Sequence, residues 1–395
     1  MGGGLMQLVA YGAQDVYLTG NPQITFFKVV YRRHTNFAAE SIEQTFNGAV
    51  GFGSKLVATI SRNGDLITNC WIQAKITPAD GSGSTFVNCL GHKLIKTVEL
   101  EIGGQKIDKH YGEWLEIWSE LTLPEEKLAG YKAMVHKYDT GTSITASTEP
   151  VDLYIPLIFF FNRNPGLALP LIALQYHEVK ISVETTPAAE LVQTNSNLPK
   201  SLSASLWVDY IYLDTDERRR FAQVSHELLI EQVQEMKESV TAASTSRVRL
   251  TMNHPIKELI WVFRDSTVMA TGAADPYDFS DVDSSGNSGH LMDKAKLQLN
   301  GHDRFAQREA SYFHLVQPYQ HHTRIPKRPI YVYSFALKPE EHQPSGTCNF
   351  SRIDNASLNL EMLGSSNDSI QVQVFAVNYN VLRIMSGMGG LAYSN

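Results

Sequence analysis

The stretch Val98-Glu-Leu-Glu-Ile-Gly-Gly104 decides the fold class, because three apolar side chains alternate with two glutamates before a glycine turn. Successive side chains of a β-strand point to opposite faces, so this period of two predicts a strand with one buried face. The same alternation returns at residues 295–299, 356–362 and 370–374. Short alternating runs separated by Gly, Pro, Asn and Ser predict an all-β sandwich or barrel.

Helical patterns are few and short. Residues 113–121 place two Trp with Leu and Ile at helical spacing, and Pro124 followed by two glutamates indicates the start of a second helix. Residues 214–221 predict one or two helical turns after a strand at 206–213. Because no helix falls regularly between strands, the sequence argues against a parallel α/β sheet.

A weak internal duplication runs through the chain. Three blocks of the first half return in the same order in the second half, joined by segments of different length. Three matches in one order favour two similar β domains, with a boundary near residues 213–216. The matched blocks are Ile42-Glu-Gln and Ile230-Glu-Gln, residues 98–104 and 295–301, and Leu153-Tyr-Ile and Ile330-Tyr-Val.

Composition excludes several classes of protein. The chain has 395 residues, of which 43% are apolar and 19% are charged, so it buries sizeable cores and is not disordered. Its 34 basic and 41 acidic residues give a net charge of −7, so direct binding of nucleic acid is not expected. Cys70, Cys89 and Cys348 form no C-x-x-C pair, which predicts free thiols in a reducing compartment. Neither a signal peptide nor a membrane-spanning stretch is expected.

No constellation typical of an enzyme or of a resident cofactor stands out. The common nucleotide-binding, serine-hydrolase and zinc motifs are absent from the sequence. A weak calcium-like loop contains Asp281, Asp283 and Ser285, but Met292 stands where such a loop has its bidentate glutamate. We therefore expect no catalysis, no cofactor and no metal.

Other polar side chains favour structural interpretations. The pair His321-His322 is predicted to point to opposite faces of a strand, which does not suit metal binding. Three glycosylation sequons occur, at Asn349, Asn355 and Asn367. The first two lie beside or within a predicted strand, so Asn367 is the one candidate that we expect to be exposed.

Several long stretches are specific enough to carry a family resemblance. They include Gly12-Ala-Gln-Asp-Val-Tyr-Leu-Thr-Gly-Asn-Pro-Gln-Ile-Thr-Phe-Phe27 and Pro165-Gly-Leu-Ala-Leu-Pro-Leu-Ile-Ala-Leu-Gln-Tyr-His-Glu-Val179. Tyr379-Asn-Val-Leu-Arg-Ile-Met-Ser-Gly-Met-Gly-Gly-Leu-Ala-Tyr393 extends the series almost to the end of the chain. Further stretches are 61–67, 99–110, 156–162, 213–221, 299–301 and 344–355. In all of them the chain resembles the major capsid proteins of nucleocytoplasmic large DNA viruses, those of algal viruses and iridoviruses above all.

The resemblance implies two consecutive antiparallel eight-stranded jelly rolls, with a few short helices in loops. It implies an N-terminal arm over residues 1–24, a first jelly roll over 25–213, and a second over 214–395 that includes a Gly-rich tail. The implied function is that of a structural major capsid protein of a large icosahedral double-stranded DNA virus. Its homotrimers would form pseudo-hexagonal capsomers that tile the shell.

The resemblance also implies partners and a location. The partners are the chain itself as a homotrimer, neighbouring capsomers and minor capsid proteins, with the inner face near an internal membrane. The location is the capsid of the virion, assembled in the host cytoplasm. The arm before Ile24 and the tail over 386–395 show no strand pattern, so we expect them to reach neighbours or the underside of the shell.

Two other functions stay open at this point. A minor capsid or glycan-binding jelly-roll paralogue of the same virion would expose aromatic side chains, for which Tyr277 and Phe279 are the candidates. An enzyme built on a β-sandwich would need a nucleophile, a metal site or an acid–base pair, and none stands out.

Overall fold

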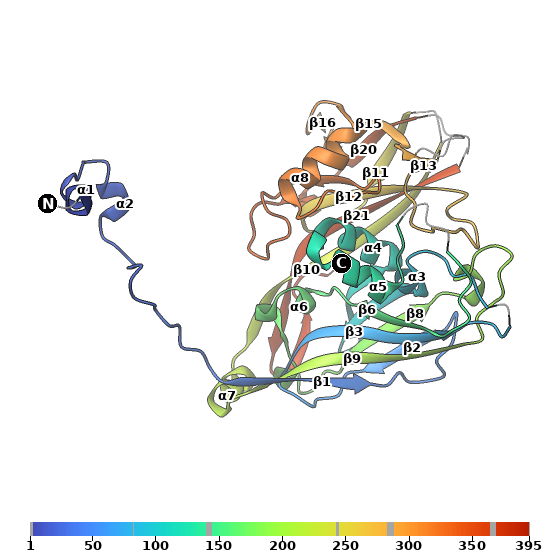
Figure 1. The fold of residues 1–395 in the computed structure, drawn as a ribbon, viewed down its shortest axis with the longest axis horizontal. Helices are drawn as coiled ribbons and strands as arrows, with labels where there is room; N and C mark the ends of the chain where they lie inside the picture. Colours follow the sequence, from blue (N-terminus) through green and yellow to red (C-terminus); the bar gives the residue numbers. More distant parts are fainter. Residues whose placement is uncertain are drawn as a thin grey trace. The chain divides into compact units, whose positions relative to one another are not determined.

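The computed structural model describes residues 3–81, 83–139, 144–241, 245–282, 288–363 and 369–394. The chain divides into two compact units, residues 1–36 and 37–395 (Figure 1). The smaller unit contains two short helices, α1 (Gly3–Val9) and α2 (Val16–Thr19), followed by a segment without helix or strand. Most of its large apolar side chains are exposed.

Two antiparallel sheets from residues 37–213 enclose one apolar core and form what we call roll 1. The β3 sheet has the order β1-β9-β3-β6, and the β4 sheet has the order β2-β8-β4-β5. Ile72 and Leu206 from the first sheet meet Leu100 and Ile181 from the second in this core. The strands are β1 (Phe37–Gln44), β2 (Lys55–Thr59), β3 (Leu66–Thr77), β4 (Ile95–Ile102), β5 (Gln105–Tyr111), β6 (Val151–Pro156), β7 (Leu169–Pro170), β8 (Val179–Thr185) and β9 (Ser201–Leu213).

Residues 226–391 form roll 2 in the same manner, around a second apolar core. The β12 sheet has the order β10-β21-β12-β18, and the β15 sheet has the order β11-β20-β15-β16. The strands are β10 (His226–Thr241), β11 (Thr245–Leu250), β12 (Pro255–Asp265), β13 (Asp281–Val282), β14 (Ser288–Gly289), β15 (Met292–Leu299), β16 (His302–Asp303), β17 (Arg308–Glu309), β18 (Tyr331–Ser334), β19 (Cys348–Asn349), β20 (Ala356–Met362), β21 (Ser369–Met385) and β22 (Met388–Leu391).

The two rolls have one strand order. With the short strands β7, β13, β14, β17, β19 and β22 left out, each roll puts its first, eighth, third and sixth strands in one sheet and the others in the second. This is the arrangement of a jelly roll, so the predicted fold of two consecutive antiparallel jelly rolls is confirmed. The three matched sequence blocks lie on the first, fourth and sixth strands of the rolls, which explains the duplication.

In the third matched block, the sequence match and the structural match differ by one residue. Tyr154 points out of roll 1 and is 40% exposed, whereas Tyr331 is buried in the core of roll 2. The two tyrosines therefore lie on equivalent strands but on opposite faces, because a shift of one residue exchanges the faces of a strand.

Helices lie in the connections between strands, as predicted. The helix expected at residues 113–121 is α4, and the turns expected at 214–221 are α7. No helix among the described residues is both long and apolar enough to cross a membrane. The helices of the larger unit are α3 (Leu90–Leu94), α4 (Gly112–Thr122), α5 (Glu125–Val135), α6 (Phe160–Arg163), α7 (Thr215–Gln223) and α8 (Gln317–His321), with a π-helical turn η4 (Tyr312–Val316) and 3₁₀ turns η1 (Pro165–Leu167), η2 (Leu171–Ala173), η3 (Ala188–Glu190) and η5 (Phe350–Arg352).

Candidate functional site: a covered face and an open face

Helix α4 begins directly after strand β5, and its sequence gives it one apolar side. Trp114, Ile117, Trp118 and Leu121 recur at intervals of three or four residues, so they lie along one side of the helix. The first position is Gly112, where a Cβ would come within 2.6 Å of the Tyr277 hydroxyl oxygen. The helix can therefore lie close against the loop of roll 2 that carries this tyrosine.

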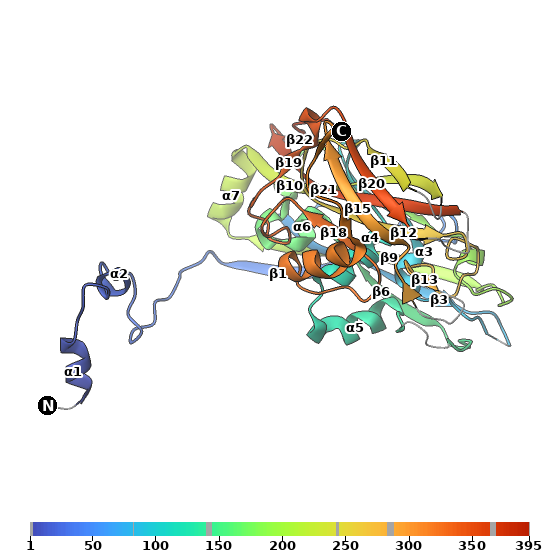
Figure 2. The ribbon, with the colours of Figure 1, turned by 90° about the horizontal axis from the view of Figure 1, so that it is seen from above.

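The apolar side of α4 covers the outer face of the β12 sheet, the face turned away from the core of roll 2. Ile260 and Val262 on β12 belong to the cluster that α4 forms with this sheet, and the rings of Trp114 and Phe375 have centroids 5.4 Å apart. In Figure 1 α4 lies between the two rolls, and Figure 2 shows the same region from above. We call this side of the β12 sheet the covered face. The cluster contains Cys89, Trp114, Ile117, Trp118, Leu121, Val233, Ile260, Val262, Tyr277, Phe279, Ile330, Val332, Phe375 and Val377.

Three carboxylates of α4 are each paired with an arginine of roll 2. They are spaced by three and four residues, so they too share one side of the helix. All six side chains are largely or fully buried, so the loss of one partner would leave a buried charge unpaired, which costs far more than breaking an exposed pair. The pairs are Glu113 with Arg264 at 2.8 Å, Glu116 with Arg328 at 3.7 Å, and Glu120 with Arg324 at 3.1 Å.

Glu116 is the centre of this ionic network. Its carboxylate also meets Lys137, and His92 Nδ1 lies 2.8 Å from its Oε2. Burial by itself would raise the pKa of Glu116, but Lys137 and Arg328 hold that pKa well below its ordinary value. The carboxylate is therefore charged and fully paired, and its partners come from both rolls.

Strands β10 and β21 form a second connection, because they run on from roll 2 into roll 1. Ile230, Leu382 and Ile384 on these strands belong to the core of roll 1. The Val233 N–H donates to Asp108 Oδ1 of strand β5 at 3.1 Å. One continuous strand pair is thus shared by the two cores, and both rolls belong to the same compact unit.

The C-terminal tail is held by the same region. Strand β22 folds back on β21, and His177 Nδ1 of roll 1 lies 3.0 Å from the Gly389 carbonyl oxygen. The Leu391 N–H donates to Gln105 Oε1 at 3.2 Å. The expectation of a tail without a strand is therefore wrong, because this segment forms a hairpin with β21 and contacts roll 1.

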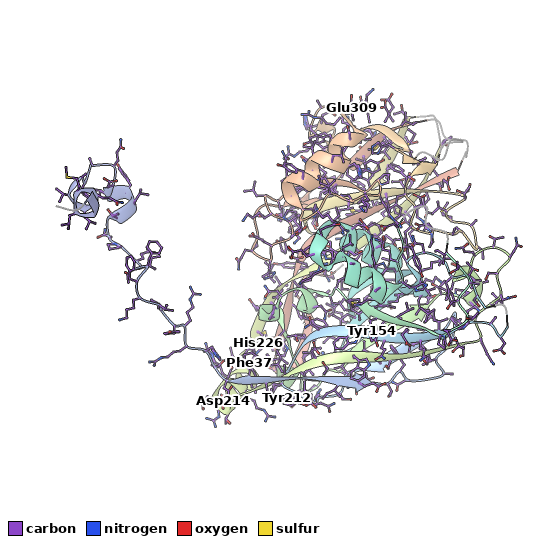
Figure 3. All side chains as sticks on the ribbon, viewed as in Figure 1. Phe37, Tyr154, Tyr212, Asp214, His226 and Glu309 are labelled. Atoms are coloured by element: carbon purple, nitrogen blue, oxygen red, sulfur yellow. The ribbon has the colours of Figure 1, made fainter. Side chains whose placement is uncertain are left out.

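The equivalent face of the β3 sheet has no such cover in the part of the chain that the structure describes. Trp71 and Trp207 stand opposite each other on β3 and β9 with parallel rings, whose centroids are 6.3 Å apart. Tyr154 on β6, labelled in Figure 3, stands opposite Gln73, which is two residues from Trp71 along β3, so it lies on the same side. Polar side chains such as Gln73 and Asp209 surround these rings. We call this side of the β3 sheet the open face.

Roll 2 contains a helix in the position that α4 has in roll 1. It lies between the fifth and sixth strands, runs from residue 310 to 321, and includes η4 and α8. Phe313 points into the core of roll 2, but Leu315, Val316 and Tyr319 are exposed by 44%, 40% and 77%. Both an open face and an uncovered helix therefore occur in each copy of the chain.

Several site residues predicted from the sequence cannot be placed. Asp283, Ser285 and Asn367 lie outside the described residues, as does the side chain of Asp281, so the calcium-like loop and glycosylation at Asn367 stay predictions. Among the described residues, no group of three His, Cys, Asp or Glu side chains could hold a metal ion. Asn349 and Asn355 are both exposed, so the expectation that only Asn367 is exposed among the sequons was wrong.

Two other expectations also need correction. Tyr277 and Phe279 are buried in the cluster under α4, so neither can contact a glycan, although their loop is rich in polar residues. His322 does not lie on a strand. It follows α8, and its ring lies 3.0 Å from Glu258 Oε2 and 2.9 Å from Glu340 Oε1.

The free thiols Cys70 and Cys89 are buried, as predicted for Cys70, and burial raises the pKa of Cys70 to about 12.

The three acidic residues of α4 were not predicted as functional. Glu113, Glu116 and Glu120 share a side of the helix expected at residues 113–121, and that spacing was the one available signal. Their arginine partners lie at Arg264, Arg324 and Arg328, far along the chain, and no local pattern connects them.

Comparison with known proteins finds similar capsid proteins over almost the whole chain. The family model described as "Major capsid protein N-terminus" matches residues 25–214, and that described as "Large eukaryotic DNA virus major capsid protein" matches residues 217–390. The major capsid protein of Pyramimonas orientalis virus is 56% identical, with 100% of both chains covered. That of Paramecium bursaria Chlorella virus 1 is 47% identical, also over 100% of both chains.

Solved structures give the same answer for the fold. VP54 of PBCV-1 matches with a TM-score of 0.82 and 41% identity, covering 94% of this chain and 100% of that one. The Faustovirus major capsid protein matches with a TM-score of 0.79 over 95% of this chain and 94% of that one, and its 13% identity makes it a likeness of fold alone. The chain therefore belongs to the family of major capsid proteins of large eukaryotic DNA viruses.

Proposed function

We propose that this structural, non-enzymatic protein forms pseudo-hexagonal homotrimeric capsomers that tile the icosahedral shell of a large double-stranded DNA virus. The observation that carries the proposal is the combination of a covered face and an open face on equivalent sheets. Within one chain, α4 of roll 1 joins the β12 sheet of roll 2. A repeat of that joint between chains would need an open face and a free helix, and each copy has both.

Cyclic symmetry would let the assembly close at three chains if each step rotates by one third of a turn. A contact between two different surfaces repeats head to tail, and it closes into a ring when the rotation per step divides a full turn. Three chains with two similar rolls each supply six similar units, which gives a hexagonal outline suited to tiling a shell. The major capsid proteins among its relatives, aligned over their whole length, support this function.

The division of the chain supports the same proposal. We assign an arm to residues 1–24, roll 1 to 25–213 and roll 2 to 214–395. The four main sheets divide between residues 37–213 and 226–391, and the two family models meet between residues 214 and 217. The arm, rich in exposed apolar side chains, would reach neighbouring capsomers, minor capsid proteins or the side that faces an internal membrane, after assembly in the host cytoplasm.

The solution mass of the purified full-length protein tests this proposal. Light scattering should give about 132 kDa, which is three times 44.1 kDa, and negative-stain images should show a hexagonal outline. A stable monomer of 44.1 kDa at micromolar concentration would contradict the homotrimer. A dimer would contradict it as well, because four rolls cannot close a ring of six.

A further inference from the structure

The open face has the composition of a docking surface. Its centre is aromatic, with Trp71, Trp207 and Tyr154, and polar side chains surround this centre. Interfaces between protein subunits concentrate their binding energy in central Trp, Tyr and Arg side chains with a polar rim. An aromatic cluster that faces water on the surface of a β-sheet therefore indicates a surface that another molecule covers.

A groove of about 590 Å³ lies beside this face. The β3 sheet contributes Trp71 and Asp209 to it, and the other wall comes from α4 and α5, with Leu123, Tyr131 and Met134. The groove is large enough for several side chains of a helix, and its lining is mostly apolar. Trp71 belongs both to this groove and to the stacked pair of tryptophans, so the groove adjoins the open face.

The covered face indicates which kind of structural element would fit on the open face. On the β12 sheet, Ile260 stands opposite Phe375, and Trp114 of the helix between the fifth and sixth strands packs on that pair. On the β3 sheet, Trp71 and Trp207 are the corresponding pair of opposed residues on the third and eighth strands. The element expected on this pair is thus the corresponding helix of a roll 2, which contains α8.

The exposed side of that helix suits such a role. Leu315, Val316 and Tyr319 lie within about one turn of each other and point away from the core that holds Phe313. No Lys, Arg, Asp or Glu occurs between residues 310 and 321, so docking would not remove a helix charge from water. His322, buried between Glu258 and Glu340, fixes the end of the helix on roll 2.

We propose that Leu315, Val316 and Tyr319 of one copy dock on Trp71, Trp207 and Tyr154 of a second copy. This inference rests on the proposed function and assigns the residues that join one chain to the next. The occupant is a second copy because the same chain already places the equivalent helix on the equivalent face. The test must distinguish this contact from docking of another segment, such as the N-terminal arm with its exposed aromatic side chains.

Photo-cross-linking of the full-length protein provides the test. Benzoylphenylalanine replaces Tyr319, and the labelled protein is mixed and assembled with isotopically heavy, unlabelled copies before irradiation. We expect light–heavy cross-linked peptides between position 319 and the segments that contain Trp71, Tyr154 or Trp207. The matched control is Tyr176, which is 75% exposed on roll 1 and should give no link to these segments.

The same samples distinguish the two levels of the proposal. A trimer whose cross-links map elsewhere, for instance to residues 1–36, would overturn the docking assignment and leave the trimer intact. A monomer would contradict the proposed function itself. As an independent readout, Tyr319→Ser should raise the trimer dissociation constant about 30-fold, since truncation of a central aromatic side chain has effects of this size. Tyr176→Ser should leave that constant unchanged, and an equal effect of both variants would overturn the assignment.

Discussion

The outer faces of the β12 sheet and the β3 sheet have the same strand order beneath them, but their surfaces differ. The covered face is apolar, carries α4, and is held by three buried Glu–Arg pairs. The open face combines two stacked tryptophans with polar side chains. A contact that forms during folding can combine apolar side chains with ion pairs, because it is never exposed to water in the folded protein. A face that waits in water for a second copy has to keep polar side chains around its aromatic centre.

Removal of one tryptophan from each face gives the largest expected contrast. Trp114→Ala should lower the free energy of unfolding by about 3–5 kcal/mol, because it leaves a cavity in the joint between the rolls. Trp207→Ala should lower it by about 1 kcal/mol, since this half-buried ring loses only its stacking with Trp71. Chemical denaturation monitored by circular dichroism measures both. Equal losses would contradict the distinction between the two faces.

The ionic network of the covered face should produce the next largest effect. Glu116→Gln keeps the size of the side chain but leaves Lys137 and Arg328 without their shared buried partner. The expected loss of unfolding free energy is about 3 kcal/mol. Glu126→Gln on the exposed side of α5 is the matched control and should change stability by less than about 0.5 kcal/mol. No difference between the two variants would show that the network does not hold α4.

The buried His322 predicts a pH dependence at the end of α8. Burial alone would lower the pKa of His322, but Glu258 and Glu340 raise it to about 9. A histidine with a raised pKa binds its proton more tightly in the folded state, so its stabilisation is complete below about pH 6.5 and is lost as the pH rises towards 9. The melting temperature should fall over that range, and His322→Gln should reduce the slope. The exposed His302→Gln should keep the slope, and an unchanged slope in His322→Gln would contradict this role.

Much of this organisation could be predicted from local patterns, and the rest depends on long-range packing. Alternation predicted strands such as β4 and β20, and helical spacing predicted α4. The apolar run of β12 has no alternation, because one side faces the core and the other faces α4. Tyr277 lies in a polar loop and is buried only because the other roll packs on it, which no local signal reveals.

The smallest effect should come from salt. The helix that contains α8 has no formally charged residue apart from its histidines, so the joint between chains should depend little on ionic strength. Raising NaCl from about 0.1 to about 1 M should change the trimer dissociation constant by less than about threefold. Sedimentation analysis measures this constant, and a weakening of tenfold or more would indicate that charged residues carry the contact between chains.

The most direct test of the account is a cryo-electron microscopy structure of the assembled capsomer. We predict that α8 of each copy lies on the Trp71–Trp207 pair of the next copy. We also predict that consecutive rolls, within and between chains, are related by rotations of about 60°. An open face that remains in contact with solvent, or that is covered by the N-terminal arm or by another element, would contradict the claim that the same helix-on-sheet contact occurs both within a chain and between chains.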